Sequence, residues 1–435
     1  MNNKLTQFAS LLILCLASVT TVAHDEIPGA PQRAPIALVG ATIHPVSSPP
    51  IIGTLIFAKG KITVVSKHIP VPRGTLSINC KGKHVYPGMF DAYSDMGLVE
   101  INAVRATNDM EEVGSINPNV RAVMSVNPDS EIIPVTRSNG ILLSVTAPTG
   151  RLIAGQSAVL MLDGWTYEDM TLQEGVGMHI RWPQMSPVSR WSTSSSSSQQ
   201  MRNRDQAIKN LHEIIRKVQH YRSARNADPQ KHGKDIRWEA MLPVLDGKVP
   251  VIVSANEIKQ IQSAVAFTQK YKLRLIIYGG YDAPACAALL KKHSIPIIVG
   301  GTYRLPRRRF DAFDSAYTLP ARLHAKKIPF CISGAGRFGA SNVRNLPYHA
   351  ATAVAYGLSQ QEALRSITLS PAEILGVAKR VGSLEVGKDA TLIVTSGNPL
   401  ETATQVELAF IQGRKVDLNN KHKRLFKKYE EKLRR

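Results

Sequence analysis

Residues 86–100 read YPGMFDAYSDMGLVE, and the interpretation of the whole chain depends on this stretch. An apolar run reaches a turn at Pro87-Gly88, and a second short run then gives way to polar residues before Gly97. Polar side chains at the carboxyl ends of parallel strands form the active sites of α/β barrels. The question is whether Tyr93 and Asp95 carry out chemistry or only support the structure.

Two strand-rich segments, residues 35–85 and 379–420, bracket the chain. In the first, Lys59-Gly60 separates two apolar runs, and in the second Gln412-Gly413 does the same. Short apolar runs joined by a glycine-containing turn are typical of β-hairpins. We expect the two segments to join into one small β-sandwich built from both chain ends.

Residues 86–378 follow a different pattern, in which strands alternate with helices. Apolar strands are expected at 249–253, 273–278, 295–299 and 328–333, with helices at 256–271, 283–292 and around 314–326. Continuous apolar strands separated by helices indicate a parallel sheet with both faces covered. The prediction is an α/β fold, a (β/α)8 TIM-like barrel. Ser254 to Glu257 match a capping box at the start of one helix.

Two further segments depart from these patterns. Residues 1–23 combine Lys4, an apolar run and a final small Ala23, which predicts a secretory signal and a periplasmic protein. No later run approaches about 18 apolar residues, so no membrane span is expected. Residues 183–204 contain a serine run and predict a mobile loop, either an insertion over the barrel mouth or a tolerated surface excursion.

The formal net charge of +21 is concentrated in part at residues 421–435, where eight Lys/Arg stand against two Glu. Such charge favours anionic surfaces, nucleic acid or an acidic partner. No nucleic-acid motif accompanies it, so we expect a solvated basic helix and no nucleic-acid partner. Beyond residue 23 the cysteines are Cys80, Cys286 and Cys331, which form neither a disulfide framework nor a zinc module.

Several motifs together point to a family. They are YPGMFDA at 86–92, IAGQSA at 153–158, GLS with EAL at 357–364, SPAEILG at 370–376, GSLEVGKDA at 382–390 and IQGRKV at 411–416. On these residues the chain resembles the amidohydrolase superfamily, and within it the imidazolonepropionase-like and prolidase-like amidohydrolases. The resemblance implies a metal-bearing barrel with a β-sandwich from both chain ends. It also implies hydrolysis of carbon–nitrogen bonds by water activated on zinc or another divalent metal.

The resemblance also implies where the metal ligands should stand. The family has His-x-His on the first barrel strand, single histidines ending the fifth and sixth, and an aspartate ending the eighth. Here those positions hold Tyr93, Asp95, Ser254 (or Asn256 after a register slip of two), Tyr278 and Gly334. Only Asp95 could still bind a metal, and no two of the 12 histidines form a His-x-His or His-x3-His pair. We therefore predict no metal and no other cofactor.

Nearby charges leave alternatives open. Asp95 is expected to pair with an arginine, to bind a ligand or to hold a metal. Arg304, Arg337 and Arg344 are candidates for binding a carboxylate or phosphate, against the plainer alternative of a solvated basic face.

These observations are consistent with three alternative functions. The favoured one is a secreted, metal-free, catalytically degenerate family member that acts as a binding or partner subunit, as a homo-oligomer or with an active relative. The second is an active hydrolase of carbon–nitrogen bonds with a non-standard site around Asp95. The third is a sensor or scavenger of a small acidic, amide-like ligand. Whether the protein is an enzyme is left open, because fold alone does not define function.

Overall fold

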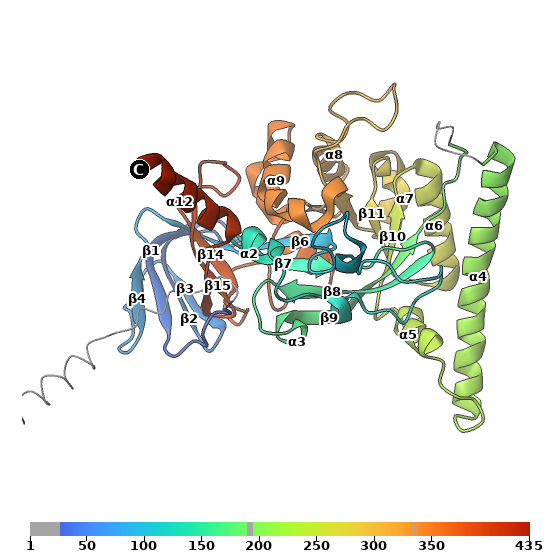
Figure 1. Ribbon diagram of the computed structural model, residues 1–435, viewed down its shortest axis with the longest axis horizontal. Coiled ribbons are helices and arrows are strands. Elements are labelled where there is room, and N and C mark those ends of the chain that lie inside the picture. The colour runs from blue at the N-terminus through green and yellow to red at the C-terminus, as the bar shows by residue number, and fades with distance from the viewer. Residues whose placement is uncertain (1–26, 189–194, 335) are drawn as a thin grey trace, which may run out of the picture.

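A computed structural model describes residues 27–188, 195–334 and 336–435 of the chain. The expected signal at 1–23 lies outside these residues. Two eight-stranded sheets make up the fold, and they lie side by side in Figure 1, with the long helix α4 on the far side of the barrel from the second sheet.

The second sheet takes strands from both ends of the chain. Its order is β16-β15-β14-β5-β1-β2-β3, with β4 paired to β1. The bounds are β1 Ile36–Ile43, β2 Ile51–Ala58, β3 Lys61–Ser66, β4 Leu76–Asn79, β5 His84–Pro87, β14 Leu392–Thr395, β15 Val406–Ile411 and β16 Arg414–Val416. Phe57 of β2 and Phe410 of β15 meet edge to face, with ring centroids 5.0 Å apart. Because three strands separate β2 from β15 in the sheet, this contact shows that the sheet curls around its own apolar core.

The other sheet is a nearly closed barrel in the order β13-β12-β11-β10-β9-β8-β7-β6. The bounds are β6 Met89–Ser94, β7 Ile141–Thr146, β8 Ile153–Met161, β9 Thr171–Arg181, β10 Val251–Ala255, β11 Leu275–Gly279, β12 Ile297–Gly300 and β13 Phe330–Ser333. The strand number agrees with the prediction, but the regular (β/α)8 alternation is wrong. Strand β8 runs antiparallel to both β7 and β9, and only short connections join these three strands. Antiparallel neighbours need no crossover helix, unlike parallel ones.

Side chains join the two edges of the barrel. Strands β6 and β13 are neighbours in space, but among the described residues no backbone ladder joins them. Instead Ser333 Oγ donates to the Tyr93 carbonyl at 2.7 Å, and the Gly334 amide donates to Asp91 Oδ1 at 2.7 Å. This seam lies beside the predicted site.

Helices cover the barrel. Their bounds are α2 Ile132–Arg137, α3 Tyr167–Met170, α4 Ser197–Ala227, α5 Ile236–Leu245, α6 Ile258–Tyr271, α7 Ala287–Lys292, α8 Leu319–Ala325, α9 Leu346–Ala355, α10 Gln360–Ser366, α11 Leu369–Ile374 and α12 Lys421–Arg434. The 3-10 helices are η1 Arg105–Thr107, η2 Ala122–Ser125, η3 Ala283–Cys286 and η4 Gly336–Asn345. Among the helices of the described residues, none is both long and apolar enough to cross a membrane.

Two local predictions need correction. The serine-rich segment is not a loop throughout, because α4 begins at Ser197 and the Ser196 hydroxyl accepts from the Gln199 amide; residues 189–194 lie outside the described part. The predicted capping box at Ser254 is displaced. Helix α6 is capped by Glu257, which forms the box with Gln260. Ser254 therefore belongs to strand β10.

Candidate functional site

The five predicted ligand positions lie at the carboxyl ends of their barrel strands. Parallel pairing sets Arg181 of β9 opposite Ser254 of β10, and Ser254 opposite Tyr278 of β11. Residues in register on parallel strands point to the same face of the sheet. Ser254 and Tyr278 therefore share the barrel interior, at the end where barrel enzymes carry their active sites.

A pair of stacked tyrosines fills this interior. The rings of Tyr93 and Tyr278 lie 3.7 Å apart between centroids, at an interplanar angle of 13°. They come from β6 and β11, which are not adjacent strands, so the stack crosses the barrel. Burial raises the pKa of both phenols, with Ser254 near the Tyr93 hydroxyl and Arg304 near that of Tyr278. Both rings stay protonated at neutral pH.

Asp91 lies beneath the stack and is fully buried. Its Oδ1 accepts the Gly334 amide, whereas its Oδ2 has no hydrogen-bond partner among the described residues. Burial raises the pKa of this carboxyl to about 7, and the bonds from Gly334 and Ser333 oppose the shift only in part. Asp91 is therefore partly ionised at neutral pH, and its hydrogen bond from Gly334 joins the two edges of the barrel.

Asp95 accepts a backbone amide, and among the described side chains no arginine pairs with it. Its Oδ1 accepts the amide of Ala340 in η4, and its carboxylate lies against Gly339 so closely that a β-carbon there would overlap it. Gly339 adopts φ +59°, a region that favours glycine. Burial raises the pKa of the Asp95 carboxyl, and the backbone hydrogen bonds lower it. The carboxylate positions η4 across the end of β6.

His179 also belongs to the site and was not predicted. It comes from β9, and its ring centroid is 5.4 Å from that of Tyr93. It is buried, and its Nε2 has no hydrogen-bond partner among the described residues. Burial lowers the pKa of the ring to about 3, so it is neutral. A lone histidine without a partner motif gives no sequence signal.

The two candidate arginines with described side chains, Arg304 and Arg344, have different surroundings. Arg304 lies over Gly300, where a β-carbon would be 2.5 Å from its Nη2, and beside Tyr278. Arg344 instead contacts His422 of α12 through Nη1 at 3.1 Å. The side chain of Arg337 lies outside the described residues. Of the two arginines with described side chains, only Arg304 reaches the tyrosine pair, and it has no carboxylate partner within the described part of the chain.

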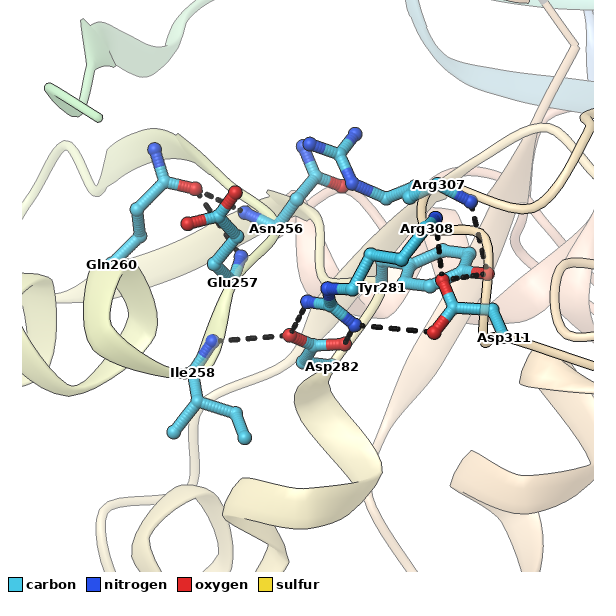
Figure 2. Close-up of polar contacts among 9 residues, drawn as sticks. All are labelled: Asn256, Glu257, Ile258, Gln260, Tyr281, Asp282, Arg307, Arg308 and Asp311. Atoms are coloured by element: carbon cyan, nitrogen blue, oxygen red, sulfur yellow. Dashed lines mark hydrogen bonds and ion pairs between the residues drawn. The ribbon is translucent and has the colours of Figure 1, made fainter. Parts of the chain in front are cut away.

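A second arginine group lies in the loop after β12 (Figure 2). Arg308 binds both carboxylate oxygens of Asp282 and also pairs with Asp311 at 3.5 Å. The Tyr281 hydroxyl donates to Asp311 at 3.2 Å. These acids raise the pKa of the Arg308 guanidinium. Arg308 is thus used internally, and it holds the loop against the segment that follows β11.

The donor atoms at the strand ends do not fit the divalent metal that the fold family implies. Zinc sites use cysteine, histidine and carboxylate ligands in near-tetrahedral geometry. At the positions that the resemblance assigns to the ligands, the chain has two stacked phenols, the Ser254 hydroxyl and Gly334, and the Asp95 carboxylate accepts a backbone amide. Within the described ranges no three His, Cys, Asp or Glu side chains group closely enough to hold a metal.

A cavity lies at the opposite end of the barrel. It has a volume of about 850 Å3, and residues at the amino ends of β10 to β13 line it, including Pro250, Leu275, Pro296 and Pro329. None of the predicted site residues lines it. Barrel enzymes carry their sites at the carboxyl ends of the strands, so the tyrosine pair remains the candidate site.

The barrel and its second sheet are similar to known hydrolase structures. An amidohydrolase from Thermotoga maritima MSB8 superposes with a TM-score of 0.78 at 23% identity, over 88% of this chain and 99% of that one. A prolidase complexed with N-methylphosphonate-L-proline gives a TM-score of 0.55 at 16% identity, over 88% and 99% of the two chains. Molinate hydrolase gives 0.53 at 14% identity, over 90% and 96%. These similarities establish the fold class.

Sequence comparison gives a family match over part of the chain. The Amidohydrolase family profile matches residues 313–420. Amidohydrolase tasK of Hapsidospora irregularis is 22% identical over 406 residues, which is 83% of this chain and 39% of that protein. The chain thus spans about two fifths of the length of this curated relative. Residues 313–420 thus match the family that the motifs resemble, and the solved structures show the same fold.

Proposed function

We propose that this protein is a catalytically degenerate amidohydrolase that binds a ligand or a partner without hydrolysing it. The observation that carries the proposal is the Tyr93–Tyr278 stack. The two phenol rings, at positions that the resemblance assigns to metal ligands, have their centroids 3.7 Å apart. Each ring occupies space that a metal and its water would need. The second sheet, a composite sandwich in this proposal, supports the barrel from both chain ends.

The remaining polar groups serve the structure. Asp91 fastens the barrel seam, and Asp95 accepts a backbone amide of η4. His179 is neutral, and its ring centroid lies 5.4 Å from that of Tyr93. Hydrolysis of an amide at neutral pH needs an activated nucleophile, which the family obtains from a metal. These side chains supply no equivalent activation.

A turnover assay tests this proposal. The purified protein, with added zinc or manganese, is incubated with prolyl dipeptides and N-acyl amides, and release of amine is followed. The expected result is no release above that of a matched Asp95→Asn variant. Metal-dependent turnover that disappears in Asp95→Asn would instead establish the alternative, an active hydrolase built around Asp95.

Arg304 favours a more specific ligand class, a small acidic amide-like molecule. Its guanidinium lies at the tyrosine pair without a carboxylate partner among the described residues. Arginine binds carboxylates with two parallel hydrogen bonds. The proposed ligand places its carboxylate on Arg304 and its apolar part against the tyrosine faces. In this proposal, the protein acts as a binding subunit that presents such a ligand to an active relative.

Thermal unfolding tests this ligand class. A ligand present at about 100 times its Kd stabilises the folded state by about 2.7 kcal/mol. N-acyl amino acids should therefore raise the melting temperature of the wild type and not that of Arg304→Leu. Arg344→Leu is the matched control, because this arginine faces α12 and should leave the shift unchanged. An equal shift in all three proteins would reject Arg304 as the anchor.

A further inference from the structure

Helix α12 presents its apolar side chains outward. The helix spans Lys421–Arg434 and contains no buried residue. Leu425, Phe426, Tyr429 and Leu433 are 41%, 68%, 55% and 87% exposed. At about 100° per residue these four side chains fall within an arc of about 100°. A helix on a globular protein normally turns such a stripe toward the core.

Polar contacts fasten the same helix to the protein. At its start, Asn420 is 2% exposed, caps the Lys423 amide and donates to Ser138 Oγ at 2.9 Å. Along the helix, Arg424 approaches Glu131 at 3.7 Å. Arg424 lies about 150° from the middle of the apolar arc on the helical wheel. In the first turn His422 also contacts Arg344 at 3.1 Å. Beyond that turn the helix meets the protein through its polar side, and its apolar stripe faces away, as its position at the edge of the molecule in Figure 1 allows.

Cations flank the apolar stripe on both sides. Lys421, Lys428 and Lys432 fall along one edge of the arc, and Lys423, Lys427 and Arg434 lie beyond the other. The two acids of the helix are paired internally, Glu430 with Arg434 at 2.6 Å and Glu431 with Arg435. An apolar stripe between rows of lysine and arginine is typical of helices that lie in the plane of a membrane surface.

We propose that α12 binds the surface of an anionic lipid bilayer, with Phe426, Tyr429 and Leu433 inserted among the lipid chains and the flanking lysines at the headgroups. A second copy of the chain is a poor occupant, because two helices that each carry this charge would repel each other. Nucleic acid would use the cations but would leave the apolar stripe exposed. An anionic bilayer satisfies both features, and the inference does not depend on the proposed function of the barrel.

Vesicle sedimentation with the full chain tests the proposal. Vesicles of mixed phosphatidylglycerol and phosphatidylcholine should bind the protein at least about tenfold more tightly than phosphatidylcholine alone, and added salt should weaken binding. Phe426→Ser/Leu433→Ser and Lys428→Glu/Lys432→Glu should each lose binding by about tenfold or more. Val113→Ser and Lys231→Glu/Lys234→Glu are the matched controls at exposed positions elsewhere and should bind as the wild type does.

Several results would overturn the proposal. Equal binding to both vesicle types, or binding unaffected by the α12 variants, would show that the helix is not the anchor. Displacement by inorganic phosphate would indicate a site for free anions rather than a bilayer. An oligomer that Phe426→Ser/Leu433→Ser converts to a monomer would assign the stripe to contacts between copies. Oligonucleotide binding without vesicle binding would assign the cations to nucleic acid.

Discussion

Replacing Asp91 by asparagine removes the charge of this side chain but keeps its hydrogen bond from Gly334. In the wild type, Asp91 Oδ1 accepts the Gly334 amide, and Oδ2 is buried without a partner among the described residues. Asparagine has the same shape and keeps an oxygen for Gly334, but it cannot ionise. Any difference between the two proteins that changes with pH therefore reports the carboxylate.

The magnitude follows from the pKa of Asp91. The carboxyl ionises near 3.8 when unfolded and near 7 when folded, so the folded state binds more protons between these values. Stability from this group therefore rises as pH falls from about 7 toward about 4, and the ionised carboxylate costs about 4 kcal/mol above that range. The Asp91→Asn variant avoids this cost. Relative to wild type, its unfolding free energy should increase by about 3 kcal/mol between about pH 5 and about pH 8.

The assay is equilibrium denaturation in urea, monitored by tryptophan fluorescence, for both proteins at the two pH values. The new amide hydrogens near the former Oδ2 have no acceptor, which lowers the variant's stability by about 1–3 kcal/mol at every pH. Only the change in the difference with pH is diagnostic. A difference that stays constant between the two pH values would refute a buried, weakly acidic Asp91.

Three further substitutions test the site. Burial lowers the pKa of His179, so its contribution to stability is lost as pH falls below about 6.5. Between about pH 7 and about pH 4, the unfolding free energy of wild type should therefore fall by about 3 kcal/mol more than that of His179→Gln. Parallel pH profiles of the two proteins in urea denaturation would contradict this. Tyr278→Ala should cost about 3 kcal/mol or more by removing one ring of the stack, whereas Tyr278→Phe should cost about 1 kcal/mol, as measured by thermal unfolding; equal losses would show that the stack contributes nothing. Gly339→Ala should cost about 2–3 kcal/mol through positive φ and overlap with Asp95, and only about 1 kcal/mol in an Asp95→Ala background; additive losses in the double-mutant cycle would show that the two residues do not touch.

Much of the fold was predictable because its signals are local. Continuous apolar runs identify β10 to β13, and the glycine turns at Gly60 and Gly413 mark the hairpins of the second sheet. The direction of β8 was not predictable, since an apolar run identifies a buried strand but not its orientation. The cap at Glu257 was misplaced by three residues because Ser254 to Glu257 also matched the capping pattern.

The site was predictable where a motif set the register and not elsewhere. The first-strand motif located Tyr93 and Asp95, and strand endings located Ser254 and Tyr278, but the stacking of the two rings required the closure of the barrel. Arg344 was a candidate for anion binding from its charge alone, and the structure places it at the end of η4 against His422 of α12.

The central claim, that the family metal site has been replaced by a tyrosine stack, is tested most directly by metal stoichiometry. The protein is purified from medium supplemented with zinc, dialysed, and its metal content is measured by mass spectrometry beside an Asp95→Asn control. The claim predicts well below about 0.1 equivalents of zinc in both proteins, since a divalent site needs three or more ligands. About one equivalent in the wild type that is lost in Asp95→Asn would contradict it.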